Sequence, residues 1–435
     1  MIRRPRLRHV LGPTRIAAVA VLLVLVGLTA VFAGSVMAFN IQIQTITREI
    51  NTATATVIGL FATPDQTELF IHWLGGILML LGIFLAGLAI RNVIVHFVET
   101  LSPSVKGGRV GAYVRKQQLS QGPHIVALGG GTGLSTLLRG LKQHSSNITA
   151  IVTVTDDGGS SGQLILDKGM IPPGDIRNCL VALADAEKAM TDLFQHRFIE
   201  SGALNGHSMG NLLIAALVDQ ARGDFEQAIN IASDVLAIRG KVMPSTLDHV
   251  GLRARLDDDS EVSGETAIVQ AGKKIRELQL SPGNVSAYPA ALEAIADAEL
   301  ICIGPGSVYT SVIPNLLIPG MKEALKSSKA IKVYICNVMT QPGESDNLSA
   351  SEHASAILQQ VKDKVFDYVL INTGIPDNEV LEKYKLSGQN LVEPDTDRLR
   401  AMGLKVIQGN FISTSDVVRH DPVKVVSRLM AQIGL

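Results

Sequence analysis

The sequence predicts a doubly wound, mostly parallel α/β sheet with a small β-rich insertion, preceded by two transmembrane helices. Short apolar runs recur after residue 122, and most are followed by small polar residues and then by a helix-like stretch. Two of these runs end in glycine-rich loops, and two long apolar stretches occupy the N-terminal part of the chain. Repeated strand–loop–helix units are typical of a parallel sheet covered by helices on both faces.

The two apolar stretches, residues 16–38 and 71–98, are long enough to cross a membrane, since roughly 20 apolar residues span the hydrocarbon core of a bilayer. Mean hydropathy is +0.27, and 46% of the chain is hydrophobic against 18% charged. That composition is more apolar than in a typical soluble enzyme. A signal peptide would have a shorter apolar region and no second span. A buried helical hairpin is the alternative interpretation.

The distribution of basic residues predicts the orientation of the spans. Arginines are concentrated in the tail 1–15 and basic residues follow the second span, whereas the loop 39–70 contains only Arg48. Because cytoplasmic flanks are enriched in Lys and Arg, we expect a two-pass protein of the cell (inner) membrane with both termini in the cytoplasm. Residues 99–121 are rich in Ser, Pro, Gly and Lys, which predicts a linker before a cytoplasmic domain at 122–435.

Net charge and cysteine usage narrow the function classes. A net charge of −1 gives no electrostatic case for nucleic-acid binding. The three cysteines are scattered in or beside apolar runs, as expected for reduced, buried thiols of a cytosolic domain. A homo-oligomer is left open.

The first glycine loop follows the apolar run His124–Leu128 and contains Gly129, Gly130, Gly131, Thr132 and Gly133. A glycine loop between a strand and a helix can hold a phosphate with backbone N–H groups. It is not a Walker A loop, because no Gly-Lys-Ser/Thr follows. A tight strand-to-helix turn is the alternative.

The next two motifs also follow or open predicted elements. Asp156 and Asp157 follow the strand-like run 150–155, where they could hold a ribose hydroxyl, a divalent cation or a substrate proton; a solvated Asx turn is the alternative. In the segment 172–178, Asp175 is placed to cap a helix. Arg177 and Asn178 would then lie in its first turn, where a ligand role and a capping role are equally plausible.

Residues 205–211 contain a G-x-S-x-G pattern around Ser208. This pattern marks a serine nucleophile only where a buried strand precedes it, and the preceding residues here are helix-like and then polar. We therefore favour a ligand loop at a helix N-terminus, in which Asn205, His207 and Asn211 supply hydrogen bonds. A plain helix cap is the alternative.

The later part of the chain repeats the α/β pattern after a short-period region. Residues 241–285 alternate apolar and polar positions, which predicts the β-rich insertion. The strand-like run Leu300–Ile303 precedes a second glycine loop with Gly304, Gly306 and Ser307. Two further strands are predicted at 331–336 and 366–371. Since parallel strands end at one edge of the sheet, all these polar loops are expected to form one cleft.

Taken in order, the motifs GGGTG, DDGGSSG, PPGDIRN, NGHSMGN, GPGSVYTSVIPN and NVMTQPGE resemble the gluconeogenesis-factor family. This family is related to the 2-phospho-L-lactate transferases, and the resemblance covers about residues 122–435. It implies a Rossmann-like sheet that binds a nucleotide diphosphate. In the gluconeogenesis-factor branch the ligand is a UDP-sugar such as UDP-N-acetylglucosamine, and the TQPGE segment and residues 419–422 are similar to that branch.

The resemblance also implies residue roles. Gly129–Gly133 would hold the diphosphate, while Asn205, His207 and Asn211 would line the nucleotide site. Asp156 and Asp157 would face the reacting or metal position, and Tyr384 and Arg419 would contact the sugar or uridine.

Three functions are therefore expected in order. The first is a non-catalytic, membrane-anchored UDP-sugar-binding regulator of cell shape, envelope synthesis and carbon metabolism. The second is a transferase that moves a phospho-acid from a guanosine-diphosphate-linked donor to a deazaflavin precursor, with Asp156 or Asp157 catalytic and Mg²⁺ required. The third is a serine hydrolase that uses Ser208. No cofactor is firmly indicated, and the metal ligands are unknown.

Overall fold

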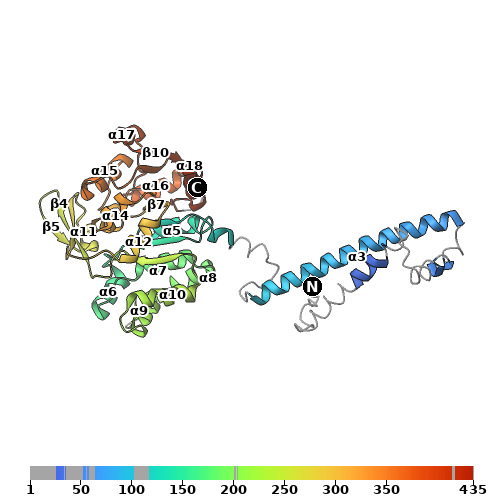
Figure 1. Ribbon diagram of the computed structural model, residues 1–435. Coiled ribbons are helices and arrows are strands. Elements are labelled where there is room, and N and C mark those ends of the chain that lie inside the picture. Colours follow the sequence, from blue (N-terminus) through green and yellow to red (C-terminus); the bar gives the residue numbers. More distant parts are fainter. Residues whose placement is uncertain are drawn as a thin grey trace. The chain divides into compact units, whose positions relative to one another are not determined.

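The structure is a computed structural model that describes residues 26–33, 35, 52–54, 56–57, 64–101, 117–199, 202, 204–413 and 417–434. The chain divides into two compact units, Met1–Lys116 and Gln117–Leu435. Each unit is described by itself below (Figure 1).

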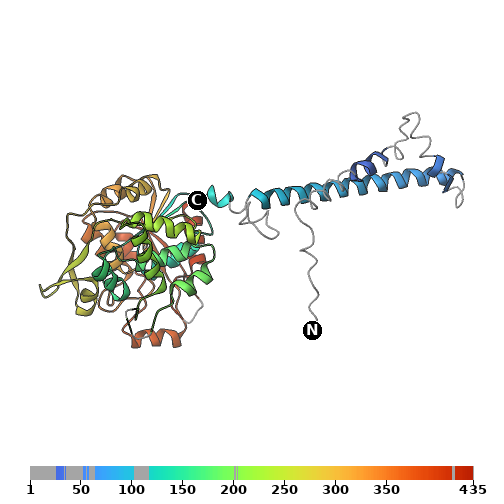
Figure 2. The ribbon, with the colours of Figure 1, turned by 90° about the horizontal axis from the view of Figure 1, so that it is seen from below.

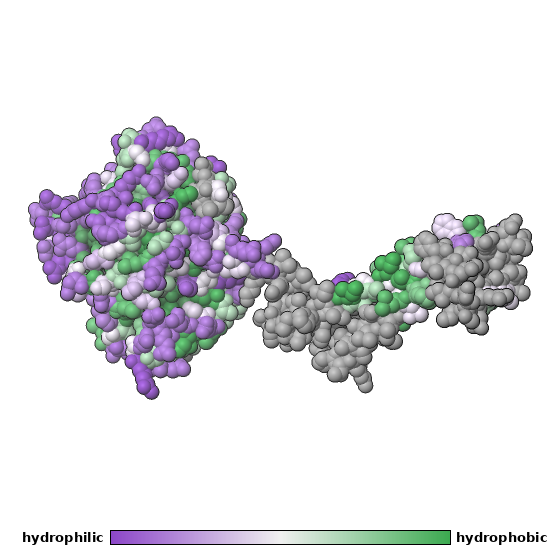
Figure 3. All heavy atoms as spheres, viewed as in Figure 1, coloured by the Kyte–Doolittle hydropathy of each residue, from purple (hydrophilic) through white to green (hydrophobic). Residues whose placement is uncertain are grey.

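The N-terminal unit contains one long helix, α3 (Pro64–Leu101), which both ribbon views show as continuous (Figures 1 and 2). Its segment His72–Arg91 has a mean hydropathy of 2.3 and is the one helix among the described residues that is long and apolar enough to cross a membrane. Large apolar side chains on it are exposed, among them Leu80 and Phe84, and Figure 3 shows green, hydrophobic atoms along this helix. This helix coincides with the second predicted span.

The first predicted span, 16–38, lies largely outside the described residues. Its described part, 26–33 and 35, is helical and packs antiparallel against α3. A Cβ added to Gly82 would lie 2.6 Å from the Gly27 carbonyl oxygen, and the Ser35 hydroxyl lies 3.6 Å from the Met79 sulfur. Small residues at such a contact let two helix backbones approach closely, as in membrane helix pairs. The two membrane spans therefore stay a prediction, which the close contact between Gly27 and Gly82 favours.

The second unit is built on a seven-stranded sheet in the order β10-β9-β8-β7-β1-β2-β3. Every neighbouring pair is parallel, so the structure has the predicted Rossmann-like α/β architecture. The strand order reverses beside β1, since β2 lies on one side of it and β7 on the other. Such a switch point is where open α/β sheets bind ligands. The strands are β1 (Ile125–Gly129), β2 (Ile148–Val152), β3 (Lys241–Pro244), β7 (Leu300–Ile303), β8 (Ile331–Ile335), β9 (Tyr368–Asn372) and β10 (Lys405–Gly409).

Two hydrophobic cores cover the two faces of this sheet. Along β1, Ile125 and Ala127 belong to one core and Val126 and Leu128 to the other, because side chains alternate along a strand. Figure 1 shows α9 and α10 on one side of the unit and α15 and α17 on the other. The first core includes α5 (Gly131–Leu141), α6 (Gly159–Lys168), α7 (Gly174–Leu183), α8 (Glu187–Phe194), α9 (Met209–Gln220), α10 (Phe225–Leu236) and α18 (Pro422–Ile433). The second includes α12 (Pro289–Asp297), the π-helical turn η2 (Val308–Val312), α13 (Ile313–Leu317), α14 (Met321–Ser327), α15 (Ala350–Val361) and α17 (Thr396–Ala401).

The β-rich insertion is a three-stranded antiparallel sheet in the order β5-β4-β6. It contains β4 (Gly251–Leu256), β5 (Glu261–Ser263), α11 (Glu265–Ala271) and β6 (Ile275–Ser281). The predicted range 241–285 was wrong at its start. Residues Lys241–Pro244 form β3, which pairs with β2 at the edge of the main sheet, because Val242 and Met243 are buried in the two cores of that sheet.

Candidate ligand-binding site

The first glycine loop places the N-terminus of α5 directly beyond β1. Gly131 has φ +63°, a conformation that glycine adopts at little cost. A Cβ on Gly130 would collide with Thr153 and Asp175, and a Cβ on Gly133 would lie 2.5 Å from the Pro305 carbonyl oxygen. Glycine is therefore required for the helix to begin this close to its neighbours.

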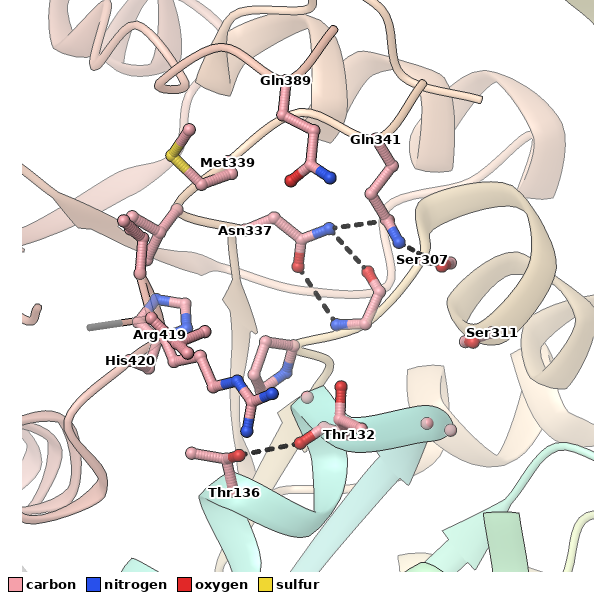
Figure 4. Close-up of a pocket in the computed structure, with 18 of the residues that line it drawn as sticks. Thr132, Thr136, Ser307, Ser311, Asn337, Met339, Gln341, Gln389, Arg419 and His420 are labelled. Carbon is pink, nitrogen blue, oxygen red and sulfur yellow. Dashed lines mark hydrogen bonds between the residues drawn. The ribbon is translucent and has the colours of Figure 1, made fainter. Parts of the chain in front are cut away.

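The second glycine loop, after β7, is held by side chains from the segment after β8. Asn337 accepts a hydrogen bond from the Gly306 N–H (3.2 Å) and donates one to the Gly306 carbonyl (2.9 Å). Gln341 donates to the Ser307 hydroxyl at 2.7 Å (Figure 4). Glu344 accepts from the N–H groups of Tyr309 and Thr310 at 2.9 and 2.8 Å. The TQPGE motif thus fixes this loop.

The two loops form the floor of a cavity of about 570 Å³ at the switch point of the sheet. One wall carries apolar and amide side chains, and another carries carboxyl groups. The lining residues are Gly130, Gly131, Thr132, Gly133, Thr136, Asp156, Asp175, Glu265, Pro305, Gly306, Ser307, Ser311, Asn337, Val338, Met339, Gln341, Tyr384, Gln389, Val417, Val418, Arg419 and His420.

Arg419 supplies a positive charge to this cavity. Its side chain is exposed, and Figure 4 shows the guanidinium directed toward Thr132 and Thr136 on α5. Tyr384, on α16 (Asn378–Leu386), accepts from the Val418 N–H at 3.1 Å and so fixes the segment that carries Arg419. The neighbouring His420 is buried, which lowers its pKa to about 4, so its imidazole is neutral at physiological pH.

Three carboxyl groups, those of Asp156, Asp175 and Glu265, also line the cavity, and Asp175 lies against the first glycine loop. Asp156 accepts from the Gly158 N–H at 2.9 Å, as in an Asx turn. Burial and the charge of Asp156 raise the pKa of Asp175 to about 6, against the opposing effects of the Gly131 amide and the Arg177 guanidinium. Burial and the nearby carboxylates raise the pKa of Glu265 to about 9. Within the described ranges, no group of three His, Cys, Asp or Glu residues is arranged to hold a metal ion.

The structure brings ten predicted site residues to the cavity and leaves others outside its lining. Those that line it are Gly130, Gly131, Thr132, Gly133, Asp156, Asp175, Gly306, Ser307, Tyr384 and Arg419. Those that do not are Gly129, Asp157, Arg177, Asn178, Asn205, His207, Asn211 and Gly304.

Four of the second set, Arg177, Asn178, His207 and Asn211, belong to a largely buried polar network beside the cavity. Arg177 donates to Ser208 and to Asn211 (2.9 Å). Asn211 donates to Ser160 at 3.1 Å, and Ser160 lies 3.0 Å from the His207 Nδ1. Arg177 also bonds Asn178, at 2.9 Å. These side chains tie α6, α7 and α9 together, which is a structural use of the motifs that we had predicted to line the nucleotide site.

Two predicted catalytic roles are corrected. Ser208 is fully buried, caps α9 by accepting from the Asn211 N–H, and follows no strand of the sheet, so it is not the exposed serine of a nucleophile elbow. Asp157 does not line the cavity. It accepts from the N–H and hydroxyl of Thr266 at 2.9 and 2.7 Å, which fastens α11 to the sheet.

Several lining residues were missed by the sequence reasoning. Asn337 and Gln341 had a signal, because they lie in the polar segment directly after a predicted strand. Glu265 and Gln389 had none: they reach the cavity from the insertion and from the segment after α16. His420 lies in the segment 419–422 that is similar to the gluconeogenesis-factor branch, but no role was predicted for it.

Comparisons with known proteins give consistent results. A family model described as 2-phospho-L-lactate transferase CofD matches residues 125–412. A gluconeogenesis factor of Bacillus subtilis (strain 168) is 47% identical over 314 residues, which are 72% of this chain and 98% of that protein. A relative from Nostoc sp. is 43% identical over 364 residues, 83% of this chain and 78% of that protein. The Nostoc match is longer than the α/β unit, so it includes residues before Gln117. A crystal structure of a Bacillus halodurans protein has a TM-score of 0.69 and 46% identity, and it covers 71% of this chain and 99% of that one.

Proposed function

Since this chain belongs to the gluconeogenesis factor family, within the wider 2-phospho-L-lactate transferase CofD family, we propose that it binds a nucleotide sugar of the UDP-N-acetylglucosamine type. The binding protein acts as a non-catalytic regulator of cell shape, envelope synthesis and carbon metabolism. The ligand occupies the cavity at the switch point of the sheet.

The observation that carries this proposal is the meeting of two glycine loops with Arg419 in one cavity. The first turn of α5 offers N–H groups that lack intrahelical partners, and its dipole favours an anion. The Arg419 side chain makes no hydrogen bond or ion pair with any residue that the structure describes, and it points at this turn (Figure 4). A diphosphate placed between them would accept hydrogen bonds from both the N–H groups of α5 and the Arg419 guanidinium.

The remaining walls suit a nucleoside. Val338, Met339 and Val417 provide apolar surface for a flat base. Gln389, whose side chain makes no hydrogen bond among the described residues, is directed into the cavity (Figure 4). The Gln389 amide offers an NH₂ donor group and a carbonyl acceptor side by side, which matches the edge of a uracil or guanine base. The volume of about 570 Å³ is within the range of small-molecule sites, roughly 300–1,000 Å³.

The test is calorimetry on the full-length protein in detergent, titrated with UDP-N-acetylglucosamine, UDP, GDP and GTP, with and without Mg²⁺. We expect the UDP ligands to bind. Arg419→Ala should weaken them about 10- to 150-fold, because a charged hydrogen bond is worth about 1.5–3 kcal/mol. Arg276→Ala, which removes an exposed arginine paired with Asp259, is the matched control and should change nothing. Binding of guanine nucleotides alone would refute the proposal.

A second candidate, the phospho-acid transferase, is favoured by one observation besides the family match. Asp175 lies against the glycine loop, where a Cβ on Gly130 would collide with its carboxylate, and Asp156 lines the same wall. An ionised carboxylate beside a phosphate is repulsive unless a proton or a cation lies between them, and Mg²⁺ could supply that charge. In this case Asp156→Asn should abolish Mg²⁺-dependent release of GMP, which is left when the phospho-acid takes one of the donor's two phosphates to the acceptor hydroxyl, while nucleotide binding persists.

We also propose that the chain is a two-pass protein of the cell membrane with both termini in the cytoplasm. The apolar helix α3, the close contact of Gly27 with Gly82 and the basic flanks support this topology. Reporter fusions test it. A periplasmic reporter should be active when fused within the loop 39–70 and inactive at the C-terminus, and the reverse pattern would refute the orientation.

A further inference from the structure

We infer that the three-stranded insertion supplies a specificity residue to the cavity: Glu265 contacts the hydroxyl-bearing sugar end of the ligand, and Asp157 is the positioning residue that holds Glu265 there. This inference rests on the proposed function, which does not assign either residue a role.

The helix that carries Glu265 is fixed at both ends. At its start, the Asp157 carboxylate accepts hydrogen bonds from the Thr266 N–H (2.9 Å) and hydroxyl (2.7 Å). Further along, Ile268 is fully buried, and the Val269 carbonyl lies so close to Gly343 that a Cβ there would collide with it. The helix α11 is therefore wedged between the DDGGSSG loop and the TQPGE loop. Glu265, one residue before Thr266, is held in the cavity wall by this arrangement.

The Glu265 carboxyl is placed where its charge is unfavourable. It makes no hydrogen bond or ion pair with the residues that the structure describes, and it shares the wall with Asp156 and Asp175. The groups that act on it are all acidic: Asp156, Asp175, Glu344 and Asp157. Burial and these charges raise its pKa to about 9, so at neutral pH it is a carboxylic acid that can donate a hydrogen bond.

A second polar residue that lines the cavity also has an atom without a partner. His420 has only 8% of its surface exposed, and its Nε2 atom has no hydrogen-bond partner in the described part of the chain. Buried polar atoms are normally satisfied. The Nε2 atom is itself buried and does not reach the open cavity, so the unpaired Glu265 carboxyl in the cavity wall is the group that indicates a polar ligand.

The chemistry of the walls assigns the parts of that ligand. Phosphates are repelled by carboxyl groups and attracted to Arg419 and the N-terminus of α5. A base fits the apolar wall beside Gln389. Asp175 lies against the glycine loop, so Asp156 and Glu265 are the acidic groups left for a sugar, whose hydroxyls donate hydrogen bonds to Asp156. The protonated Glu265 supplies the one donor that a carbonyl substituent, such as an acetamido group, requires.

The test compares UDP-N-acetylglucosamine with UDP by calorimetry on the full-length protein. Glu265→Ala should weaken the UDP-sugar about 10-fold, the size of one hydrogen bond, and should leave UDP within about 2-fold. Glu265→Gln, which keeps a donor, should retain most of the affinity. Glu261→Ala, on an exposed strand of the same insertion, is the matched control.

Asp157 is tested by a loss and a rescue. Asp157→Ala should reproduce the selective loss of the UDP-sugar, whereas Asp157→Asn should restore it, because an amide oxygen still accepts from Thr266. Thermal unfolding of each variant checks that the unit is folded. Equal effects of Glu265→Ala on both ligands, or no effect on either, would overturn the inference while leaving the proposed function intact. Failure of the wild-type protein to bind either ligand would overturn both.

Discussion

The contact between the two glycine loops gives a quantitative prediction for Gly133→Ala. The new Cβ would lie 2.5 Å from the Pro305 carbonyl oxygen and 2.8 Å from its carbonyl carbon. Ordinary van der Waals contact begins at 3.4 Å, so the loops must separate by nearly 1 Å. The obstacle is backbone, which has no rotamer that could relieve the clash. Overpacking of this kind costs about 1–3 kcal/mol.

Two assays should register this displacement. For a unit of this size, a loss of about 1–3 kcal/mol lowers the melting temperature by roughly 2–6 °C. The binding free energy of UDP ligands should fall by more than the free energy of unfolding does, because the two glycine loops that form the diphosphate site move apart. Misplacement of a binding group by about 1 Å can cost roughly 100-fold where geometry is decisive.

The matched control is Gly283→Ala, in the loop after β6. Its Cβ would be 3.6 Å from the nearest atom, the Leu280 carbonyl oxygen, and its φ is not in the left-handed region. We expect wild-type stability and affinity for this variant. Wild-type ligand affinity of Gly133→Ala would refute the argument that the two loops hold one ligand together.

Four further predictions follow from the described contacts. The pKa of Glu265 is raised to about 9 from 4.5, so between these pH values the folded state binds more protons than the unfolded state and stability falls as pH rises. Glu265→Gln should reduce this loss of stability, measured as the difference in melting temperature between pH 6 and pH 9. Glu344→Ala leaves the buried N–H groups of Tyr309 and Thr310 unpaired and should destabilise the protein by about 2–4 kcal/mol in chemical denaturation. The Asp175 carboxylate lies against the glycine loop and has a pKa of about 6, so its protonation between pH 7 and pH 5 removes a repulsion with a bound diphosphate, which does not itself titrate there. The affinity for a UDP-sugar should therefore rise as pH falls over this range, and Asp175→Asn should remove the dependence. The double substitution Ser35→Cys and Met79→Cys, at side chains that lie 3.6 Å apart, should form a disulfide in membranes. Gly82→Leu, which inserts a side chain at the Gly27 contact, should prevent it.

The elements with strong local signals were predicted near their observed places, although β2 is Ile148–Val152 where the run 150–155 was expected. The strands β1, β2, β7, β8 and β9 are runs of buried, largely β-branched residues, and such runs are readable without tertiary information. Both glycine loops follow such strands, so their place at the carboxyl edge of the sheet followed from chain order. The predicted parallel sheet and the family resemblance also agree with the structure, because both depend on these strands and the loops that follow them.

The edge strands and the far wall of the cavity could not be predicted from local patterns. Residues of β3 and β10 include exposed lysine and glutamine, which dilutes the apolar signal at the edges of a sheet. Glu265, Gln389 and His420 come from three distant segments, and only the folded chain brings them together. Arg177 and Asn211 were predicted to bind a ligand but contact neighbouring helices instead. A polar motif at the start of a helix has the same sequence pattern in both cases.

Unfavourable placements of acidic groups in the second unit identify the ligand-binding cavity better than the sequence motifs do. Like-charged carboxyls are normally kept apart or paired, yet Asp156, Asp175 and Glu265 share one wall. Sequences tolerate such local conflicts where function requires them. The arrangement is costly in the empty cavity and becomes favourable only when a ligand supplies donors to the carboxylates and a negative charge to Arg419. Ligand binding should therefore stabilise the α/β unit more strongly than contact area alone would suggest.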